Sequence, residues 1–250
     1  MEGARGCQNS CDASYRLHRK AARYLARKDS EVGAIIGCGP INKSCFRNII
    51  TQVKSLKKVY CYDLFLDKAQ ATAEWAAAKF GIEGVATDNL EEALKNTDVV
   101  TVAASRLKPL YIDSAWLKKG ATVLLTGPAT GDDNFWLGSK IVYDHIGLHE
   151  NYVSEAIESG DKEGYYKGVI GGPIYTLIDA GKLPALKEST SIGMIINGDA
   201  EGRTSDDDIY IFVACGMAVF DVAWGYDLYK TALEKGIGQK LVLWDEPALD

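Results

Sequence analysis

Short apolar runs alternate with helix-like segments between residues 29 and 145. Runs that are apolar on both faces and separated by helices are typical of parallel strands covered on both sides. The pattern therefore predicts an α/β fold with a Rossmann-type, doubly wound parallel sheet, whose ligands bind at the carboxyl ends of the strands. The predicted strands lie at 32–37, 57–65, 83–88, 98–105, 121–128 and 139–145, and the predicted helices at 14–28, 43–56, 67–81, 89–97 and 114–120.

The rhythm changes after residue 150. Residues 148–160 and 171–184 have helical character, and residues 191–198 are apolar enough for one more strand. The segment 205–238 predicts a long apolar helix, broken near Gly216, with Ser205 as its N-cap. The acidic triplet that follows Ser205 suits the first turn of such a helix, so it needs no metal ion.

Composition and charge narrow the function. The chain has 250 residues, 47% of them hydrophobic, and a formal net charge of -6, without a long basic run. These values are ordinary for a soluble globular protein and argue against a general nucleic-acid binder. An anionic cofactor stays open, because backbone N–H groups bind phosphate without a basic surface. Absence of a signal peptide and of a membrane-length apolar run makes the cytoplasm the default location.

Six cysteines occur without a C-x-x-C pair, so we expect reduced thiols. His145 and His149 have the i, i+4 spacing of a helical metal site, but His145 ends a predicted strand. We therefore expect no metal. His18 falls on the polar face of the first predicted helix, which indicates a surface residue.

The stretch "VGAIIGCGPINKS" is the clearest chemical signal. Gly37 and Gly39 follow a strand and open a helix, Pro40 suits the first helical turn, and Asp63 ends the next strand. An acid at that place binds the ribose hydroxyls of NAD and repels the 2′-phosphate of NADP, so NAD is favoured. Asn42 stands where the fingerprint has its third glycine, which favours looser packing or a different phosphate contact. The alternative is a tight turn without a nucleotide.

Small residues end the fourth and fifth strands: Ala103, Ala104 and Ser105, then Thr126, Gly127 and Pro128. They would let a cofactor lie close to the backbone, or they merely suit sheet packing. The predicted cofactor-binding residues are Gly37, Gly39, Pro40, Ile41, Asp63, Ala104, Ser105, Thr126 and Gly127.

Two further stretches carry a family resemblance. The sequences "RKAARYLARKDSEVGAIIGCGP" and "GRTSDDDIYIFVACGMAVFDVAWGYDLYKTALEKGIG" resemble the ornithine cyclodeaminase and mu-crystallin family. The stretch from "TGPATGDDNFW" to "VIGGPIYTLIDAGKLP" is similar to a subgroup that includes proteins named as tyramine oxidase subunits. The resemblance implies an NAD(P)-dependent oxidoreductase or deaminase that acts on a small amino acid, amine or imine. Hydride would pass from the carbon beside the nitrogen to the nicotinamide, or back to an imine.

The resemblance also implies a missing part. Family members have a longer N-terminal lobe that dimerises and holds substrate, so the chain reads as N-terminally truncated. The family's carboxylate-binding arginine aligns with Cys11 and its catalytic aspartate with Ala129. We expect residues 1–28 to be a remnant with a connecting helix, 29–204 the Rossmann domain and 205–250 a helix returning to the second lobe. Expected partners are a small amino acid or amine and a second chain, in a homodimer or hetero-oligomer.

Candidate catalytic groups are Asp132, Asp133 and His149. The two aspartates follow the fifth strand, where a group must take the ammonium proton or activate water, but they also suit an acidic helix cap. His149 is a candidate for substrate binding or proton relay. Arg203 and Thr204 resemble the family element that approaches the nicotinamide side. The alternative to an enzyme is a non-catalytic NAD(P)H-binding protein or an accessory subunit.

Overall fold

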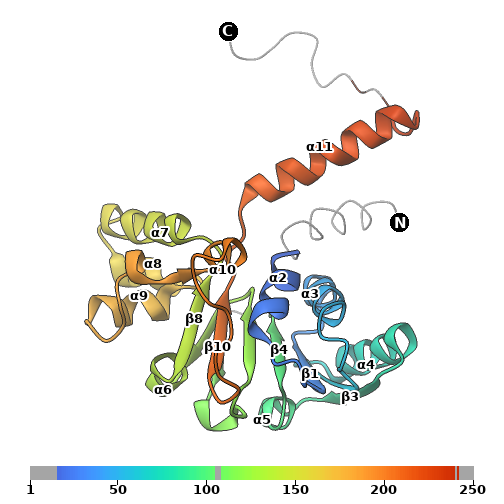
Figure 1. Ribbon diagram of the computed structural model, residues 1–250, viewed down its shortest axis with the longest axis horizontal. Coiled ribbons are helices and arrows are strands. Elements are labelled where there is room, and N and C mark those ends of the chain that lie inside the picture. The colour runs from blue at the N-terminus through green and yellow to red at the C-terminus, as the bar shows by residue number, and fades with distance from the viewer. Residues whose placement is uncertain (1–15, 105–107, 240, 242–250) are drawn as a thin grey trace. The chain divides into compact units, whose positions relative to one another are not determined.

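The computed structural model describes residues 16–104, 108–239 and 241 (Figure 1). The chain divides into two compact units. One comprises Tyr15–Gly216, and the other combines Met1–Ser14 with Met217–Asp250. The predictions for Cys11 and Ser105 concern residues outside the described ranges.

A parallel sheet forms the centre of the larger unit. Within the described ranges its strand order is β3-β2-β1-β4-β6-β10-β8-β9, and the order reverses between β1 and β4. The strands are β1 (Val32–Ile36), β2 (Lys58–Tyr62), β3 (Glu83–Thr87), β4 (Val99–Val102), β6 (Thr122–Leu125), β8 (Ser139–Tyr143), β9 (Thr190–Ser191) and β10 (Ile209–Val213). Every pairing is parallel. A second small sheet pairs β5 (Leu110–Ile112) with β7 (Ala129–Gly131).

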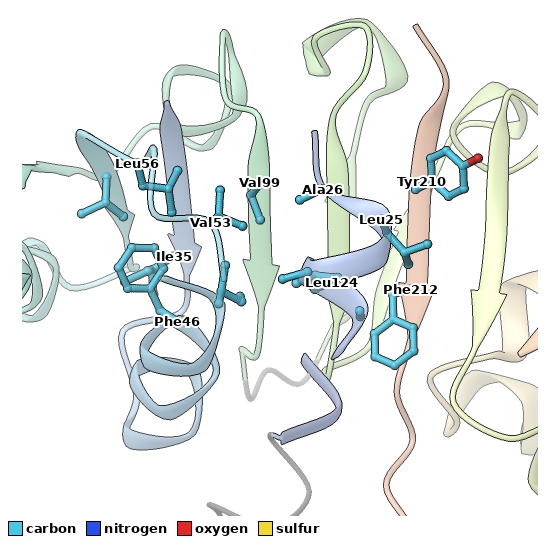
Figure 2. Close-up of a cluster of buried hydrophobic side chains, with 14 of the residues drawn as sticks. Leu25, Ala26, Ile35, Phe46, Val53, Leu56, Val99, Leu124, Tyr210 and Phe212 are labelled. Carbon is cyan, nitrogen blue, oxygen red and sulfur yellow. The ribbon is translucent and has the colours of Figure 1, made fainter. Parts of the chain in front are cut away.

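Helices cover both faces of the sheet, and neighbouring strand residues alternate between the two cores. Ile35, Phe46, Leu124 and Phe212 belong to the core on one face (Figure 2), whereas Ala34 and Ile36 belong to the core on the other. The helices of this unit are α2 (Arg16–Leu25), α3 (Pro40–Ile50), α4 (Leu66–Phe80), α5 (Leu90–Leu94), α6 (Asp133–Leu137), α7 (Ile146–Glu158), α8 (Lys162–Lys167), α9 (Gly172–Asp179) and α10 (Ile192–Asn197), with single turns η1 (Ser114–Trp116) and η2 (Leu186–Glu188). The predicted doubly wound α/β fold is confirmed.

The predicted long helix over 205–238 is wrong in its first half. Residues Ile209–Val213 form β10, which lies between β6 and β8 in the middle of the sheet. Their side chains are β-branched or aromatic and buried on both faces, which suits a central strand. The larger unit therefore extends to Gly216, beyond the boundary expected at residue 204. The strand predicted at 191–198 is also wrong, because α10 occupies it after the two-residue strand β9.

The smaller unit contains α11 (Ala218–Glu234). This helix exposes several apolar side chains, among them Val219, Val222, Tyr226 and Leu233. No helix within the described ranges is long and apolar enough to cross a membrane.

Candidate functional site

A cavity of about 390 Å³ opens at the carboxyl ends of β1, β2 and β4. It is lined by Gly37, Gly39, Pro40, Ile41, Asp63, Leu64, Phe65, Lys68, Ala103 and Ala104. Six of the predicted cofactor-binding residues thus meet in one hollow at the reversal point of the sheet. Thr126 and Gly127 follow the neighbouring strand β6, and a side chain on Gly127 would start 3.1 Å from the backbone nitrogen of Ala104.

The two turn glycines serve different purposes. Gly37 has a φ of +92°, and a Cβ there would lie 2.6 Å from the carbonyl oxygen of Ala103. Its N–H donates to the carbonyl of Tyr62 at 2.8 Å. A Cβ on Gly39, in contrast, would meet no protein atom within 4 Å. Gly37 is therefore required by the fold, and Gly39 leaves open space over the cavity.

Helix α3 begins at this cavity. Its N-cap, Gly39, provides no side-chain hydrogen bond, and Pro40 occupies the first helical turn. The first N–H groups of a helix have no acceptor within the helix, and they carry the positive end of its dipole. Such a terminus is a binding site for a phosphate group.

Asp63 is joined directly to the glycine turn. Its Oδ2 accepts a hydrogen bond from the backbone N–H of Cys38 at 2.8 Å, and its Oδ1 accepts one from the N–H of Phe65 at 3.2 Å. These bonds fix the carboxylate at the end of β2, on the wall of the cavity. Each oxygen keeps a lone pair for a ligand hydroxyl.

Asn42 corrects the expectation of loose packing. Its side chain is fully buried, and its Nδ2 donates to the carbonyls of Ile36 (2.8 Å), Gly37 (3.0 Å) and Thr101 (3.0 Å). Its Oδ1 accepts from the hydroxyl of Thr101 at 2.7 Å. The side chain ties α3 to the turn and to β4, and its polar atoms bond within the protein. The glycine fingerprint contains no signal for this role.

The candidate aspartates have structural partners. Asp132 accepts from the N–H of Ser114 at 2.7 Å and from its hydroxyl at 2.8 Å. Partial burial raises the pKa of Asp132, but the two donors lower it by more, so the pKa lies below its usual range. Asp133 pairs with Lys182 at 2.7 Å. The catalytic role of both aspartates stays a prediction.

His149 lies in a buried chain of polar groups. Its Nε2 is 2.9 Å from Oδ1 of Asp144, and its Nδ1 is 2.6 Å from the hydroxyl of Tyr175. All three side chains belong to the face covered by α7 and α9. A catalytic role of His149 stays a prediction. Within the described residues no group of three metal-binding side chains occurs.

His18 does not lie on the surface, so that prediction is wrong. The side chain is 1% exposed, packs edge-to-face on Phe212, and places Nε2 2.6 Å from the hydroxyl of Thr126. Burial lowers the pKa of His18 to about 4, partly offset by the charge of Asp144. Helix α2 thus brings an ionisable group to the end of β6. The basic residues beside His18 in the sequence had indicated a solvent-exposed helix face instead.

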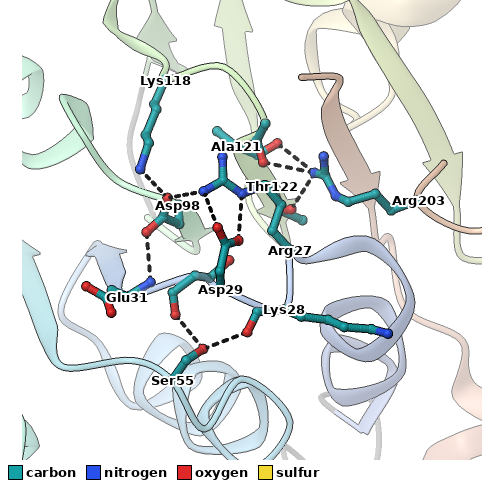
Figure 3. Close-up of polar contacts among 12 residues, drawn as sticks. Arg27, Lys28, Asp29, Glu31, Ser55, Asp98, Lys118, Ala121, Thr122 and Arg203 are labelled. Atoms are coloured by element: carbon teal, nitrogen blue, oxygen red, sulfur yellow. Dashed lines mark hydrogen bonds and ion pairs between the residues drawn. The ribbon is translucent and has the colours of Figure 1, made fainter. Parts of the chain in front are cut away.

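Arg203 also departs from its expectation. It lies at the amino end of β6, where its guanidinium donates to the carbonyl of Gly120 (3.0 Å) and the hydroxyl of Thr122 (3.1 Å) (Figure 3). The ligand cavity is at the opposite, carboxyl edge of the sheet. The implied approach to the nicotinamide side is therefore wrong, and Arg203 ties loops together instead.

The doubly wound sheet, the glycine turn and the carboxylate after β2 define the Rossmann class of dinucleotide-binding folds. The chain belongs to the ornithine cyclodeaminase/mu-crystallin family, whose family model matches residues 20–236.

Several curated relatives are dehydrogenases or reductases. N-((2S)-2-amino-2-carboxyethyl)-L-glutamate dehydrogenase of Staphylococcus aureus is 28% identical over 90% of this chain and 62% of its own length. Alanine dehydrogenase of Archaeoglobus fulgidus is 31% identical over 88% of this chain and 63% of its own length. The chain thus spans less than two thirds of the length of these relatives.

Solved structures agree on the fold. Δ(1)-pyrroline-2-carboxylate reductase of Thermococcus litoralis, in complex with NADH and L-proline, matches with a TM-score of 0.75 and 23% identity, over 92% of this chain and 66% of that one. An archaeal alanine dehydrogenase dimer with bound NAD matches with a TM-score of 0.72 and 25% identity, over the same shares.

Proposed function

We propose that the chain binds NAD(H) in the cavity between the glycine turn and Asp63. The observation that carries this proposal is the bond from the N–H of Cys38 to Asp63, which fixes an acid and a helix N-terminus around one hollow. Two relatives of this fold, the pyrroline-carboxylate reductase and the archaeal alanine dehydrogenase, hold NADH or NAD.

The cavity suggests how the dinucleotide lies. The pyrophosphate would rest on the first turn of α3 over Gly39, where a Cβ would find open space. The adenine ribose would donate its hydroxyls to Asp63. The nicotinamide would then extend past Ala104 toward Thr126 and Gly127. The Asp63 carboxylate repels a 2′-phosphate, so NAD(H) is preferred over NADP(H).

The reaction we propose is hydride transfer at a carbon–nitrogen bond of a small amino acid, amine or imine. The family assignment and the named relatives, which act on amino acids and a cyclic imine, support it. The bound nicotinamide would supply or accept the hydride. Asp132, Asp133 and His149 stay the candidate proton-handling groups. Membership of the tyramine oxidase subgroup, assembly into a homodimer or hetero-oligomer, and a cytoplasmic location stay predictions.

A fluorescence titration tests the cofactor assignment. Binding in the cavity should enhance NADH fluorescence, with weaker affinity for NADPH. Asp63→Ala removes the ribose acceptor and should weaken NADH about tenfold or more, because hydrogen bonds to charged groups contribute roughly 1.5–3 kcal/mol. Asp179→Ala is a matched control, since its carboxylate pairs with Lys162 and does not line the cavity.

The possible outcomes distinguish failure of the cofactor assignment from failure of the proposed reaction. Absence of binding by the wild-type chain, or equal affinity in the wild type and Asp63→Ala, overturns the cofactor assignment. If binding holds, NAD reduction with a panel of small amino acids and amines, and NADH oxidation with cyclic imines, tests the reaction. Binding without turnover on any of them would favour the non-catalytic alternative.

A further inference from the structure

Asp144 directly follows β8 and is 4% exposed. Its Oδ1 accepts from the N–H of His145 (2.8 Å) and faces Nε2 of His149 (2.9 Å). Its Oδ2 accepts from the N–H groups of Cys215 (2.8 Å) and Gly216 (3.0 Å). Four donors therefore converge on one buried carboxylate, and two of them belong to a segment about seventy residues away in sequence.

The histidine is itself oriented by a tyrosine. Nδ1 of His149 is 2.6 Å from the hydroxyl of Tyr175, and burial raises the pKa of that phenol. The Asp144 carboxylate can only accept, so the Nε2 atom that faces it carries the imidazole proton, and the phenol of Tyr175 can then donate to Nδ1. The ring of Tyr143 packs edge-to-face on the imidazole at 4.6 Å. The chain Tyr175–His149–Asp144 is thus directed toward the Cys215–Gly216 backbone.

The Cys215–Gly216 segment lies where the chain leaves the larger unit. It follows β10, and the N–H of Ala214 donates to the carbonyl of Leu125 at 2.9 Å, beside the end of β6. Gly216 is the last residue of the larger unit and has a φ of +83°. The next residue, Met217, is the extended N-cap of α11. The segment therefore lies at the carboxyl edge of the sheet and at the exit from this unit.

We propose that Asp144 is a positioning residue that anchors the Cys215–Gly216 backbone where the chain leaves the larger unit. A buried carboxylate is costly unless its donors stay in place, so release of the two N–H groups is opposed by more than the loss of two ordinary hydrogen bonds. His149 and Tyr175 support the anchor by keeping a third donor on the carboxylate. The proposal is independent of cofactor binding.

Amide hydrogen exchange of the full-length chain, resolved by residue with NMR, tests this anchor. The N–H groups of Cys215 and Gly216 should be protected in the wild type. Asp144→Asn should speed their exchange by about tenfold to a hundredfold, and Tyr175→Phe by several-fold, relative to β1 and β4 amides. The ¹⁵N shifts of His149 should show the Nε2–H tautomer in the wild type and lose that preference in Asp144→Asn, because an amide can donate as well as accept.

Tyr166→Phe is the matched control, because its ring packs on Tyr175 in the same apolar core. It should leave exchange at Cys215 and Gly216 unchanged. If Asp144→Asn fails to fold, Tyr175→Phe carries the test. Unchanged exchange at these two amides in a folded Asp144→Asn or Tyr175→Phe variant overturns the proposal. An equal increase at all amides of the larger unit also overturns it, because that marks a general packing role.

Discussion

Asn42 and Thr101 hold each other through two hydrogen bonds. The amide of Asn42 donates to the backbone carbonyl of Thr101 at 3.0 Å, and the hydroxyl of Thr101 donates to the Asn42 oxygen at 2.7 Å. Both side chains are fully buried. The pair joins α3 to β4 at the point where the strand order reverses, so the geometry of the glycine turn depends on it.

We expect Asn42→Ala to lower the free energy of unfolding by roughly 3 kcal/mol, because it leaves buried carbonyls and a hydroxyl without their donor or acceptor. Thr101→Val, which removes one hydrogen bond and preserves shape, should cost about 1 kcal/mol. Urea unfolding followed by circular dichroism measures both. An Asn42→Ala variant as stable as the wild type would show that the glycine turn does not depend on the Asn42 side chain.

The two turn glycines should respond differently to alanine. Gly37→Ala forces a β-carbon against the Ala103 carbonyl at positive φ, so it should destabilise the fold and lower NADH affinity together. Gly39→Ala meets no protein atom within 4 Å, so stability should be nearly unchanged. Its affinity for NADH should fall at least tenfold, because the added methyl occupies the path of the pyrophosphate. Thermal unfolding with NADH titration measures both effects.

An unchanged NADH affinity in Gly39→Ala would also test the proposed position of the dinucleotide. A Gly39→Ala chain with wild-type stability and wild-type affinity would show that no ligand approaches the turn at this residue. That outcome would count against the proposed dinucleotide pose, even if NADH binds elsewhere on the chain.

The sequence predicted those parts of the molecule whose conformation depends on residues that are close together in the chain. The strand β1, the glycine turn that follows it and the acid at the end of β2 each follow from a short run of neighbouring residues. The cavity that unites them needed no long-range information beyond the parallel sheet itself. This is why six of the predicted cofactor-binding residues line one cavity, whereas Ser105 lies outside the described residues.

Long-range contacts determine the rest. The apolar run of β10 is as compatible with a buried helix as with a central strand, and only its place between β6 and β8 decides. His18 is buried because Thr126 and Phe212, more than a hundred residues away, pack on it. No periodicity within one helix reveals such partners. For the same reason, no local pattern marks Asp144 as the centre of a polar network.

The burial of His18 predicts a pH dependence of stability. Its pKa is about 4 in the folded chain, below the 6.5 of an exposed histidine, so the unfolded chain binds more protons between these values. Stability therefore rises with pH in this window, is full above about pH 6.5, and is lost as pH falls toward 4. The contribution is on the order of 3 kcal/mol.

Urea unfolding at a series of pH values between 4 and 7 checks this, with His18→Gln as the comparison. Glutamine retains a polar partner for Thr126 but does not titrate, so its stability curve should be flatter over the window. Asp98 and Asp144, whose pKa values lie below the usual range despite burial, lose their contributions at still lower pH. Parallel curves for the two chains would show that His18 does not govern this dependence.

The position of Arg203 in the structure differs from the position that the family resemblance implied. Its guanidinium donates to the carbonyls of Leu25 (2.6 Å), Ser205 (2.8 Å), Asp208 (2.7 Å) and Gly120 (3.0 Å), and it lies over the ring of Tyr210. Lysine lacks the planar five-donor fork, so Arg203→Lys should lower the free energy of unfolding by roughly 3 kcal/mol.

NADH affinity of the folded Arg203→Lys chain should stay at the wild-type value, because the guanidinium lies at the amino edge of the sheet. Arg19→Lys, at an exposed position on α2, is the control and should change neither quantity. Urea unfolding and NADH titration on the same preparations measure the two effects. A fall in affinity at unchanged stability would instead place Arg203 beside the nicotinamide, as the resemblance implied. Its bonds to Gly120 and Thr122, at the start of β6, would then have to break when the cofactor binds.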